Sequence, residues 1–587
     1  MDTSSKHKIN HEQAVGVLSY ILLTLVITLG FVFWVGITKS DIFNYPIEYG
    51  TGDIAVVLYR SHEMRLDNAI LAFDQLGAPD YSNTYNYYAF DILILVIQYI
   101  FAKITPSYII GFNFFVLGGS YFNGISSLYA FRRLGFRRLT SVAPAVVMAA
   151  TPFYFFRALG HTYLSYYFAV PIACVLAIEI ANGSYASLFD KSNDLKKRIS
   201  NLLLLIIIGC SGMYYVYFSA FFFLIALIYR LFNQRSHKEV VSALQAIGIS
   251  TITMIIAAIP YIHNVINGTT GILASARIGS APDAADNLSL HFMSLILPVV
   301  GHRIPALSAI RDNYLLHTCG EEADVNCLGF ILAICLFSIP ILVIVRKFRT
   351  ELFSILLTFI SVALFISLRS PINKNIIYIV PYIRCYNRIS IYLSFLSSVV
   401  LAYVLDKITV KIIDKHSKRV AVLLEVIIIL FVCNFAYWDQ AGKDQFPTDD
   451  IIVTSKTLFD EESAFVDSFS TDKEQNIYII PYEDFPEGLP QNELRANDLF
   501  SLVVHSNTIN ISFGSIPGTE SYDNLNAIAY ENIESQVRFA LSEGYNGVIL
   551  AKPAFQAETQ EIVINEISTL LGSPAASSSR FVYWSIQ

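Results

Sequence analysis

The fold is decided by the stretch VGVLSYILLTLVITLGFVFWVGI at residues 15–37 and by TKSDIFNYPIEYGTGD, which follows it at residues 38–53. The first stretch carries no charged residue, and it exceeds the about 20 residues that a helix needs to cross ~30 Å of hydrocarbon. The second opens a loop, extending to residue 88, that is dense in acidic and aromatic side chains. Together they predict a membrane protein with a long polar loop directly after its first span.

Apolar runs recur as far as residue 438, and most of them reach the length of a membrane span. The predicted spans are Val15–Ile37, Tyr108–Phe131, Thr140–Phe156, Thr162–Ala181, Met213–Tyr229, Ala243–Ile262, Leu328–Val345, Leu352–Leu368, Ile389–Leu405 and Val420–Trp438, with a shorter run at Asn201–Cys210. Ala89–Lys103 is apolar too, but it contains Asp91 and Gln98, and we interpret it as an interfacial or membrane-embedded helix. The expected fold class is an α-helical polytopic membrane protein with about eleven transmembrane helices.

The composition supports this class. The chain is 54% hydrophobic and 15% charged, whereas a soluble protein carries about 25% charged residues. Its mean hydropathy of +0.51 excludes a water-soluble enzyme, a coiled coil and a disordered chain. The sequence contains no P-loop, dinucleotide fingerprint, Ser-His-Asp arrangement or nucleic-acid patch, so we expect no nucleic-acid partner.

Charge divides the chain into two expected domains. Residues 439–587 hold 23 acidic and 7 basic residues, a net charge of −16, whereas residues 1–438 hold 33 basic and 24 acidic residues, a net charge of +9. We predict a transmembrane domain at 1–438 and a C-terminal α/β domain at 439–587. Three short apolar runs in the second domain indicate strands and two amphipathic stretches indicate helices: Asn476–Pro481, Tyr545–Ala551 and Phe581–Ile586, then Glu531–Ser542 and Gln556–Leu571.

Sidedness follows from basic residues in short loops, which favour the cytoplasm. The clusters are Lys6/Lys8, Arg132–Arg138, Lys191–Arg198, Arg230–Lys238, Arg346–Arg349 and Lys407–Arg419. Placing them inside makes the N-terminus cytoplasmic and puts the loops Thr38–Tyr88 and His263–Cys327 outside, together with the tail from Asp439.

The first external loop carries the main catalytic candidate. Asp53 ends the sequence Gly-Thr-Gly-Asp, in which glycines allow the backbone to approach a ligand closely. A carboxylate at the membrane–water boundary can act as a general base toward a sugar hydroxyl. The alternative is a solvated or helix-capping acid. Asp41, Asp67 and the neighbouring Asn68 are secondary candidates.

Basic residues at the outer face are the second group of candidates. Arg157 and His161 lie four residues apart and share one face if the helix continues. Arg384, Asn387 and Arg388 crowd a second outer segment, against the usual charge bias. Arginine binds phosphate through paired donors, so these residues are candidates for holding a phosphate. Snorkelling toward headgroups, or binding of an ordinary anionic lipid, is the alternative.

Two cysteines lie close together in the second external loop. Cys319 and Cys327 bound the sequence CGEEADVNC, and a local disulfide is expected if that side is oxidising. Two free thiols are the alternative. No metal-ligand spacing occurs in the sequence. We therefore predict no definite cofactor, and we leave open a divalent metal ion.

Several short motifs occur in a fixed order along most of the chain. They are Gly50–Asp53, Leu76–Pro79, Arg157 with Gly160-His161 and Leu164-Ser165, Ile383-Arg384 with Asn387–Ser390, Ile480–Glu487, His505-Ser506 and Glu543–Val548. This set resembles the GT-C superfamily of membrane glycosyltransferases, and more closely bacterial sugar translocase or phosphoglycerol-transferase-like proteins of surface-polysaccharide synthesis. One departure is Asn86, which stands where the resemblance leads us to expect a second acidic residue.

The resemblance implies a glycosyltransferase of the bacterial inner membrane, multi-pass, working on the periplasmic face. Its donor would be a polyprenyl-phosphate-linked sugar, and its acceptor a surface glycan such as O-antigen or lipopolysaccharide. Asp53 would be the base, and Arg157, His161, Arg384 and Arg388 would hold the donor phosphate. The alternatives are a flippase of lipid-linked sugars and a scaffold subunit whose tail recruits other envelope proteins.

Overall fold

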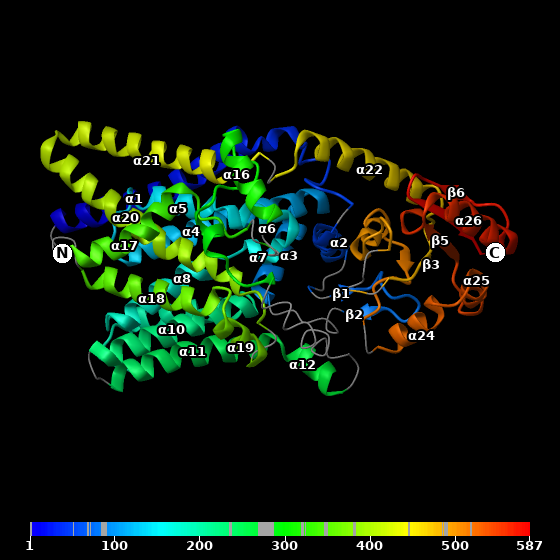
Figure 1. Ribbon diagram of the computed structural model, residues 1–587, viewed down its shortest axis with the longest axis horizontal. Helices are drawn as coiled ribbons and strands as arrows, with labels where there is room; N and C mark the ends of the chain where they lie inside the picture. The colour runs from blue at the N-terminus through cyan, green and yellow to red at the C-terminus, as the bar shows by residue number, and fades with distance from the viewer. Residues whose placement is uncertain are drawn as a thin grey trace.

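The computed structural model describes most of the chain. The described residues are 3–50, 52–66, 70, 72–83, 91–233, 237–267, 287–317, 322, 325–345, 350–379, 383–443, 446–483, 485, 491–516 and 519–586. Figure 1 shows a helical bundle at one end of an elongated molecule and a smaller domain at the other, with the chain termini at opposite ends.

The bundle is built from helices of very different length. Its elements are α1 (Thr3–Gly30), η1 (Phe31–Val35), η2 (Ile37–Lys39), α2 (Gly52–Leu66), α3 (Ile92–Ile104), α4 (Tyr108–Arg133), α5 (Val142–Ala149), α6 (Pro152–Gly160), α7 (Thr162–Ser165), α8 (Ala169–Ala181), α9 (Leu195–Gly209), α10 (Met213–Asn233), α11 (His237–Ala257), α12 (Ile259–Ile266), α15 (Phe292–Ile296), α16 (Pro305–Leu316), α17 (Phe330–Ile344), α18 (Glu351–Ser367), α19 (Pro371–Ile379), η4 (Tyr386–Ile389), α20 (Ser390–Lys415) and α21 (Lys418–Gln440).

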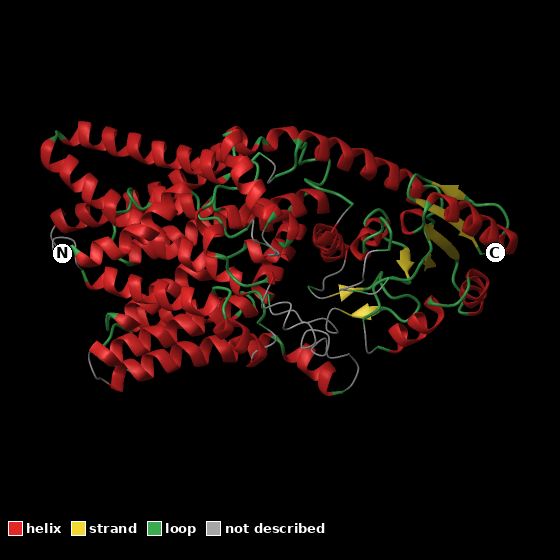
Figure 2. Ribbon diagram, in the orientation of Figure 1, coloured by secondary structure: helices red, strands yellow, loops and turns green. Residues whose placement is uncertain are grey.

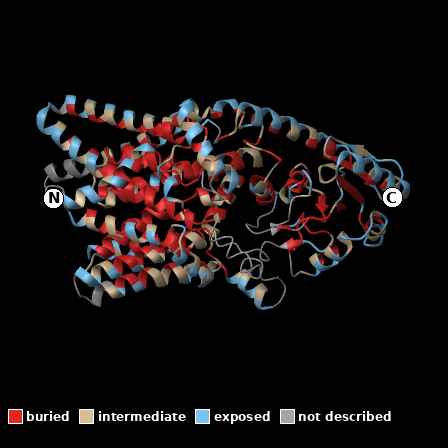
Figure 3. Cartoon of the chain, in the orientation of Figure 1, coloured by how far each residue is buried: buried red, intermediate tan, exposed pale blue. Residues whose placement is uncertain are grey.

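The predicted class, a polytopic helical membrane protein, is confirmed. Among the described residues, 6 helical segments are long and apolar enough to cross a membrane, and shorter apolar helices lie at α3, α8, α17 and α18. Burial is concentrated in the centre of the bundle, and the outer helices expose apolar side chains (Figure 3). Phe431 on α21 and Ile341 on α17 are 69% and 61% exposed, as expected of surfaces that face lipid.

Two of the predicted spans are interrupted. The run at 140–156 divides into α5 and α6, because the Thr151 side chain caps the backbone N–H of Tyr154 and Pro152 starts a new helix. The run at 162–181 divides into α7 and α8. Despite its break, the first run still lies within a helical stretch, Val142–Gly160, that is long and apolar enough to cross a membrane, whereas the second run keeps only the shorter apolar helix α8.

The tail contains the predicted α/β domain (Figure 2). Its elements are α22 (Asp449–Asp467), β3 (Gln475–Ile480), η5 (Ala496–Leu499), α23 (Phe500–Val503), β4 (Ile509–Ile511), α24 (Glu520–Ala529), α25 (Ile533–Ser542), β5 (Gly547–Ala551), η6 (Lys552–Ala554), α26 (Ala557–Leu571), β6 (Ala576–Ser577) and β7 (Phe581–Ser585). The sheet has the order β4-β3-β5-β7-β6, with β3 parallel to β4 and β5, and β7 antiparallel to β5 and β6.

The loop that follows α1 and η2 packs onto this sheet. It forms a small hairpin, β1 (Ala72–Phe73) with β2 (Ser82–Asn83), and Leu76 makes a parallel bridge to Ile511 in β4. The N–H groups of Gly77 and Ala78 donate to the carbonyls of Phe513 and Ile511, at 2.8 and 3.0 Å. Backbone bonding between these distant segments joins the loop to the tail, so the loop and tail meet directly above the bundle.

Candidate functional site

The turn that carries Asp53 is held from the tail. Gly50 and Gly52 have φ values of +90° and +62°, which favour glycine, and α2 starts at Gly52. The backbone N–H of Gly52 donates to the Asp498 carboxylate, and Arg580 Nη2 lies 3.3 Å from Asp498 Oδ2. The position of the catalytic candidate thus depends on residues more than four hundred positions away.

Tyr49 reinforces the same connection. Its hydroxyl donates to Glu462 Oε2 at 2.6 Å and lies 2.7 Å from His505 Nε2, while Glu462 Oε1 accepts from Arg580 Nη1 at 2.8 Å. Glu462 is 1% exposed, and burial raises the pKa of its carboxyl although Arg580 and Tyr49 oppose the shift. This buried network fixes the segment that leads into Asp53.

Asp53 lies in the first turn of α2, on the side that faces the bundle. Its Oδ1 accepts a hydrogen bond from Asn497 Nδ2 of η5 at 3.2 Å, and its Oδ2 lies 3.7 Å from His161 Nε2. The side chain is 51% exposed. Partial burial raises the pKa of Asp53, while the charges of Arg157 and Arg388 oppose the shift. The result is a water-accessible carboxylate with increased basicity, which suits a general base.

His161 follows α6 and faces Asp53. Partial burial, followed by the charges of Arg157 and Arg388, lowers the pKa of His161 to about 3. The imidazole is therefore neutral near pH 7, and it contributes hydrogen bonding rather than charge. A role of His161 in holding a phosphate therefore stays a prediction, in which a neutral imidazole would donate a hydrogen bond.

Arg157, Asn387 and Arg388 converge on one carboxylate, Glu322. Arg157 binds Glu322 through two hydrogen bonds, one of them 3.0 Å between Nη1 and Oε1. Arg388 Nη2 lies 3.3 Å from Glu322 Oε1, and Asn387 Nδ2 donates to Oε2 at 3.1 Å. Burial would raise the pKa of Glu322, but the charges of Arg388 and Arg157 hold it well below its usual range. The cluster therefore joins the ends of α6 and η4.

Several polar atoms of this cluster have no hydrogen-bond partner within the described part of the chain. They are the Nε atoms of Arg157 and Arg388 and the Oδ1 atom of Asn387. The Arg388 guanidinium also lies over the Tyr214 ring, 4.3 Å from its centre, which fixes its plane. Buried polar groups are normally satisfied, so the two arginine Nε–H groups are available to donate to an incoming anion, whereas the Asn387 Oδ1 atom can only accept from a hydrogen-bond donor.

Sequence reasoning missed two other members of this region. Glu322 lies in the loop that was considered only for its cysteines, although its acidic pair Glu321-Glu322 was a visible signal. Asp91 entered the sequence analysis only as an argument against a membrane span. In the structure it directly precedes α3. Burial raises the pKa of Asp91 to about 6, while the charges of Arg60 and Arg388 oppose the shift. Arg60, on α2, is itself buried and lies over the Phe73 ring.

The other predicted residues either are absent from the contacts given above for the cluster or lie outside the described residues. Asp41 sits in a tight turn with φ +47°, where its carboxylate accepts from Asn44. The hydrogen bonds described for Glu322 do not include Arg384, which is half-buried before η4. Asp67 and Asn68 lie outside the described residues.

The predicted disulfide is only partly described. Cys327 is a buried free cysteine whose Sγ donates to the carbonyl of Leu297 at 2.9 Å. Cys319 lies outside the described residues. Within the described ranges, no group of three or more His, Cys, Asp or Glu side chains is arranged to hold a metal ion.

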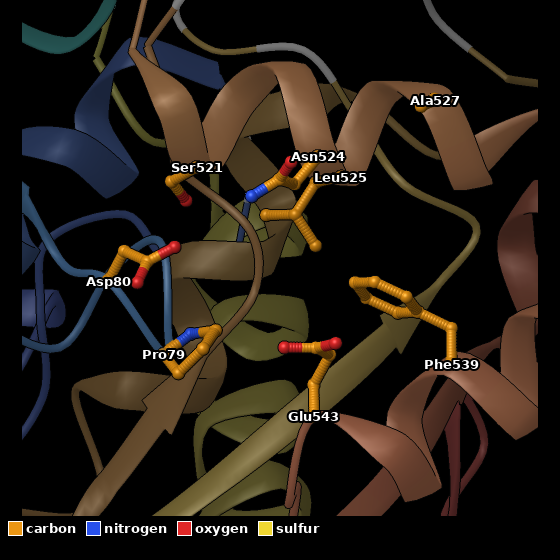
Figure 4. Close-up of a pocket in the computed structure, with 8 residues that line it drawn as sticks. All are labelled: Pro79, Asp80, Ser521, Asn524, Leu525, Ala527, Phe539 and Glu543. Carbon is orange, nitrogen blue, oxygen red and sulfur yellow. The ribbon is translucent and has the colours of Figure 1, made fainter.

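A separate hollow of about 220 Å³ lies where the first loop meets the tail helices (Figure 4). The carboxylates of Asp80 and Glu543 point toward its centre, with Asn524 and the Phe539 ring around them. None of the residues that line it is basic. This surface therefore disfavours anionic ligands.

Comparison with known proteins gave structural neighbours only. No protein-family model matches the chain, and no curated protein is significantly similar to it in sequence. The similar solved structures are membrane glycosyltransferases of the GT-C superfamily, the group that the sequence motifs resemble. ArnT from Cupriavidus metallidurans is 11% identical with a TM-score of 0.47, over 99% of this chain and 98% of ArnT. The Archaeoglobus fulgidus oligosaccharyltransferase is 13% identical with a TM-score of 0.42, over 92% and 68%. Arabinofuranosyltransferase AftD from Mycobacteria is 12% identical with a TM-score of 0.47, over 96% and 40%.

Proposed function

We propose that this chain is a membrane glycosyltransferase that moves a sugar, a hexose or close relative, from a polyprenyl-phosphate-linked donor to a cell-surface glycan. One observation carries the proposal. The Asp53 carboxylate lies 3.7 Å from His161, close to the buried arginines Arg157 and Arg388, which converge on Glu322. The site lies where the bundle meets the tail, so a lipid phosphate and a water-borne acceptor can both reach it.

Asp53 acts as the base in this proposal. The carboxylate removes the proton from an acceptor hydroxyl, and the resulting oxygen attacks the anomeric carbon of the donor sugar. Asn497 holds one carboxylate oxygen at 3.2 Å, which leaves the other directed toward His161 and the bundle. As the new glycosidic bond forms, the bond between the anomeric carbon and the phosphate oxygen breaks.

The arginines stabilise the departing lipid phosphate. Arg157 and Arg388 present guanidinium groups to one point, and paired N–H donors match phosphate oxygens. Glu322 occupies that point in the structure described here. An incoming phosphate therefore either replaces the Glu322 carboxylate or uses the unpartnered Nε donors beside it.

The acceptor is expected to be neutral or cationic where it contacts the tail. The tail has a net charge of −16, and the hollow beside Asp80 and Glu543 is lined without a basic residue. We propose that the tail is periplasmic, the N-terminus cytoplasmic and the chain a resident of the bacterial inner membrane. O-antigen or a similar surface polysaccharide fits this placement.

The test is Asp53→Asn in the purified chain, reconstituted with a polyprenyl-phosphate-linked hexose and surface glycan from cells that lack the chain. Loss of a general base lowers transfer by about 100- to 10,000-fold. Asp41→Asn is the matched control, because Asp41 is a loop carboxylate engaged in a local turn. Unchanged transfer in Asp53→Asn removes Asp53 from the mechanism.

A flippase of lipid-linked sugars is the second candidate, and a scaffold is the third. A transporter places its polar groups near the middle of the membrane, whereas Asp53, Arg157 and Arg388 gather at the end of the bundle that meets the tail. Proteoliposomes separate the three: sugar transfer supports the enzyme, lipid movement without transfer supports the flippase. A scaffold predicts that substitution of Asp53 has little effect while deletion of the tail is severe.

A further inference from the structure

The sequence RRLGFRR at residues 132–138 has so far served only to orient the chain, but it also forms a cavity. A cleft of about 370 Å³ lies where α4 ends, near the first turns of the spanning part of α1. We define the basic cleft by its lining residues: Tyr20, Tyr129, Arg132, Arg133, Gly135, Phe136 and Arg138. A single water occupies about 30 Å³ in the liquid, so the cleft has room for a molecular group.

One of the three arginines is already neutralised. Arg133 donates to both oxygens of Glu179, at 2.8 and 2.7 Å, and to the Tyr129 hydroxyl at 3.1 Å. The positive charge of Arg133 is therefore balanced by Glu179 within the bundle. Arg137, from the same motif, points elsewhere and lies 4.0 Å from Asp406, with its side chain 46% exposed.

The other two arginines converge without an acidic partner. Arg138 Nη1 and Arg132 Nη2 lie 2.7 and 3.4 Å from the place where a Cβ on Gly16 would stand. Arg132 also lies over the Tyr20 ring, 5.5 Å from its centre. No carboxylate within the described ranges forms an ion pair with either guanidinium. Like charges brought together in a half-buried cleft repel each other unless an anion lies between them.

The C-terminal end of α4 does not account for both charges. The partial negative charge at a helix C-terminus stabilises a cation in the last turn, which includes Arg132. Arg138 lies beyond the helix, after the turn at Gly135, where φ is +91°. The chain therefore turns back and places a second guanidinium beside the first.

We propose that the basic cleft binds the phosphate of an anionic phospholipid headgroup. The Arg132 and Arg138 guanidinium groups donate to the phosphate oxygens, and the Tyr20 and Tyr129 rings border the headgroup. Tyrosine and arginine at the membrane surface suit this ligand. The bound lipid ties α1 to the end of α4. The inference does not depend on the proposed transferase activity.

The test uses the full chain, purified in detergent and examined by native mass spectrometry with added phosphatidylglycerol, cardiolipin or phosphatidylcholine. We expect the two anionic lipids to be retained and phosphatidylcholine to be lost. Arg138→Gln should weaken retention about tenfold, as for a hydrogen bond to a charged group, and Arg132→Gln combined with Arg138→Gln should weaken it further. Arg137→Gln is the matched control and should behave as the unchanged chain.

Three outcomes would overturn the proposal. The first is equal retention of phosphatidylglycerol by the double variant. The second is an equal loss in Arg137→Gln, which would indicate a general effect of net charge. The third is displacement of the lipid by inorganic phosphate at a matching concentration, which would identify a soluble anion as the ligand. If the double variant does not fold, the single variant Arg138→Gln still tests the proposal. Arg138 lies in a turn outside the helices, so its substitution interrupts no helix.

Discussion

Arg580→Met is expected to loosen the contact between the tail and the turn that carries Asp53. Arg580 lies 2.8 Å from Glu462 and 3.3 Å from Asp498, two carboxylates that are only 1% and 4% exposed. Removing one partner of a buried ion pair costs about 3–5 kcal/mol, because it leaves a buried charge unpaired. Since Asp498 also accepts from the N–H of Gly52, the turn that carries Asp53 loses its support, and the rate of the proposed transfer should fall with stability.

Thermal unfolding of the purified chain, followed by its tryptophan fluorescence, measures the effect, and buried Trp584 in β7 reports on the tail. For a folded unit of 150–250 residues, each kcal/mol of lost stability lowers Tm by about 2–4 °C. The expected loss of about 3–5 kcal/mol in Arg580→Met should therefore lower Tm by about 6–20 °C. Arg538→Met is the matched control. Its ion pair with Glu534 is 2.7 Å long but 66% and 60% exposed, and such pairs contribute about 0–1 kcal/mol.

The pH dependence of the stability loss in Arg580→Met tests whether unpaired buried carboxylates cause it. Burial raises the pKa values of Glu462 and Asp498 against the charge of Arg580, and without Arg580 they rise further. A carboxyl whose pKa is higher in the folded chain binds its proton more tightly there, so the loss in Arg580→Met should shrink as pH falls. Adding Glu462→Gln and Asp498→Asn should restore Tm. A loss that is independent of pH and is not rescued would refute the reasoning.

Three further predictions concern the site itself. Arg388→Gln should raise KM for the lipid donor and lower kcat, so that kcat/KM falls by about tenfold or more through the loss of a charged hydrogen bond. Steady-state kinetics measure this, and unchanged kinetics would exclude contact between Arg388 and the donor phosphate. Gly52→Ala should destabilise the chain by about 1–2 kcal/mol because of its positive φ, whereas Gly248→Ala, in a helix with nothing near its Cβ position, should not; both are measured by Tm. His161→Asn should leave the acid limb of the pH–rate profile in place, because that limb follows Asp53, whose raised pKa makes activity fall as pH is lowered; disappearance of the limb would assign it to the imidazole instead.

Local patterns in the sequence were enough to nominate several residues that the structure brings close together. Asp53 stood out because two glycines precede it, and both have positive φ in the structure. Arg157 stood out because it lies four residues before His161, and Arg388 because its segment was expected outside, where basic residues oppose the usual bias. The structure brings these two arginines together at Glu322, although 231 residues separate them along the chain.

Residues that depend on partners distant in sequence could not be predicted. Glu322 looks like an ordinary loop acid until the ends of α6 and η4 meet around it. Asn497 contacts Asp53 from the tail, and Arg580 contacts Asp498 beside it, but no periodicity links these residues to residue 53. The breaks within the runs at 140–156 and 162–181 were also missed, because hydropathy alone does not report where a capping residue and a proline interrupt a helix.

The bridge between Leu76 and Ile511 also has a consequence for biosynthesis. Ser82, in the same loop, donates to a carbonyl 432 residues later in the chain. At about 5–20 residues per second, a ribosome takes roughly 20–90 s to reach that partner. During this interval the loop has no sheet to join, and a tail made alone would present an open β4 edge to other chains. Folding of the N-terminal loop and completion of the C-terminal domain are therefore coupled steps, and shortening the chain at either end should compromise both.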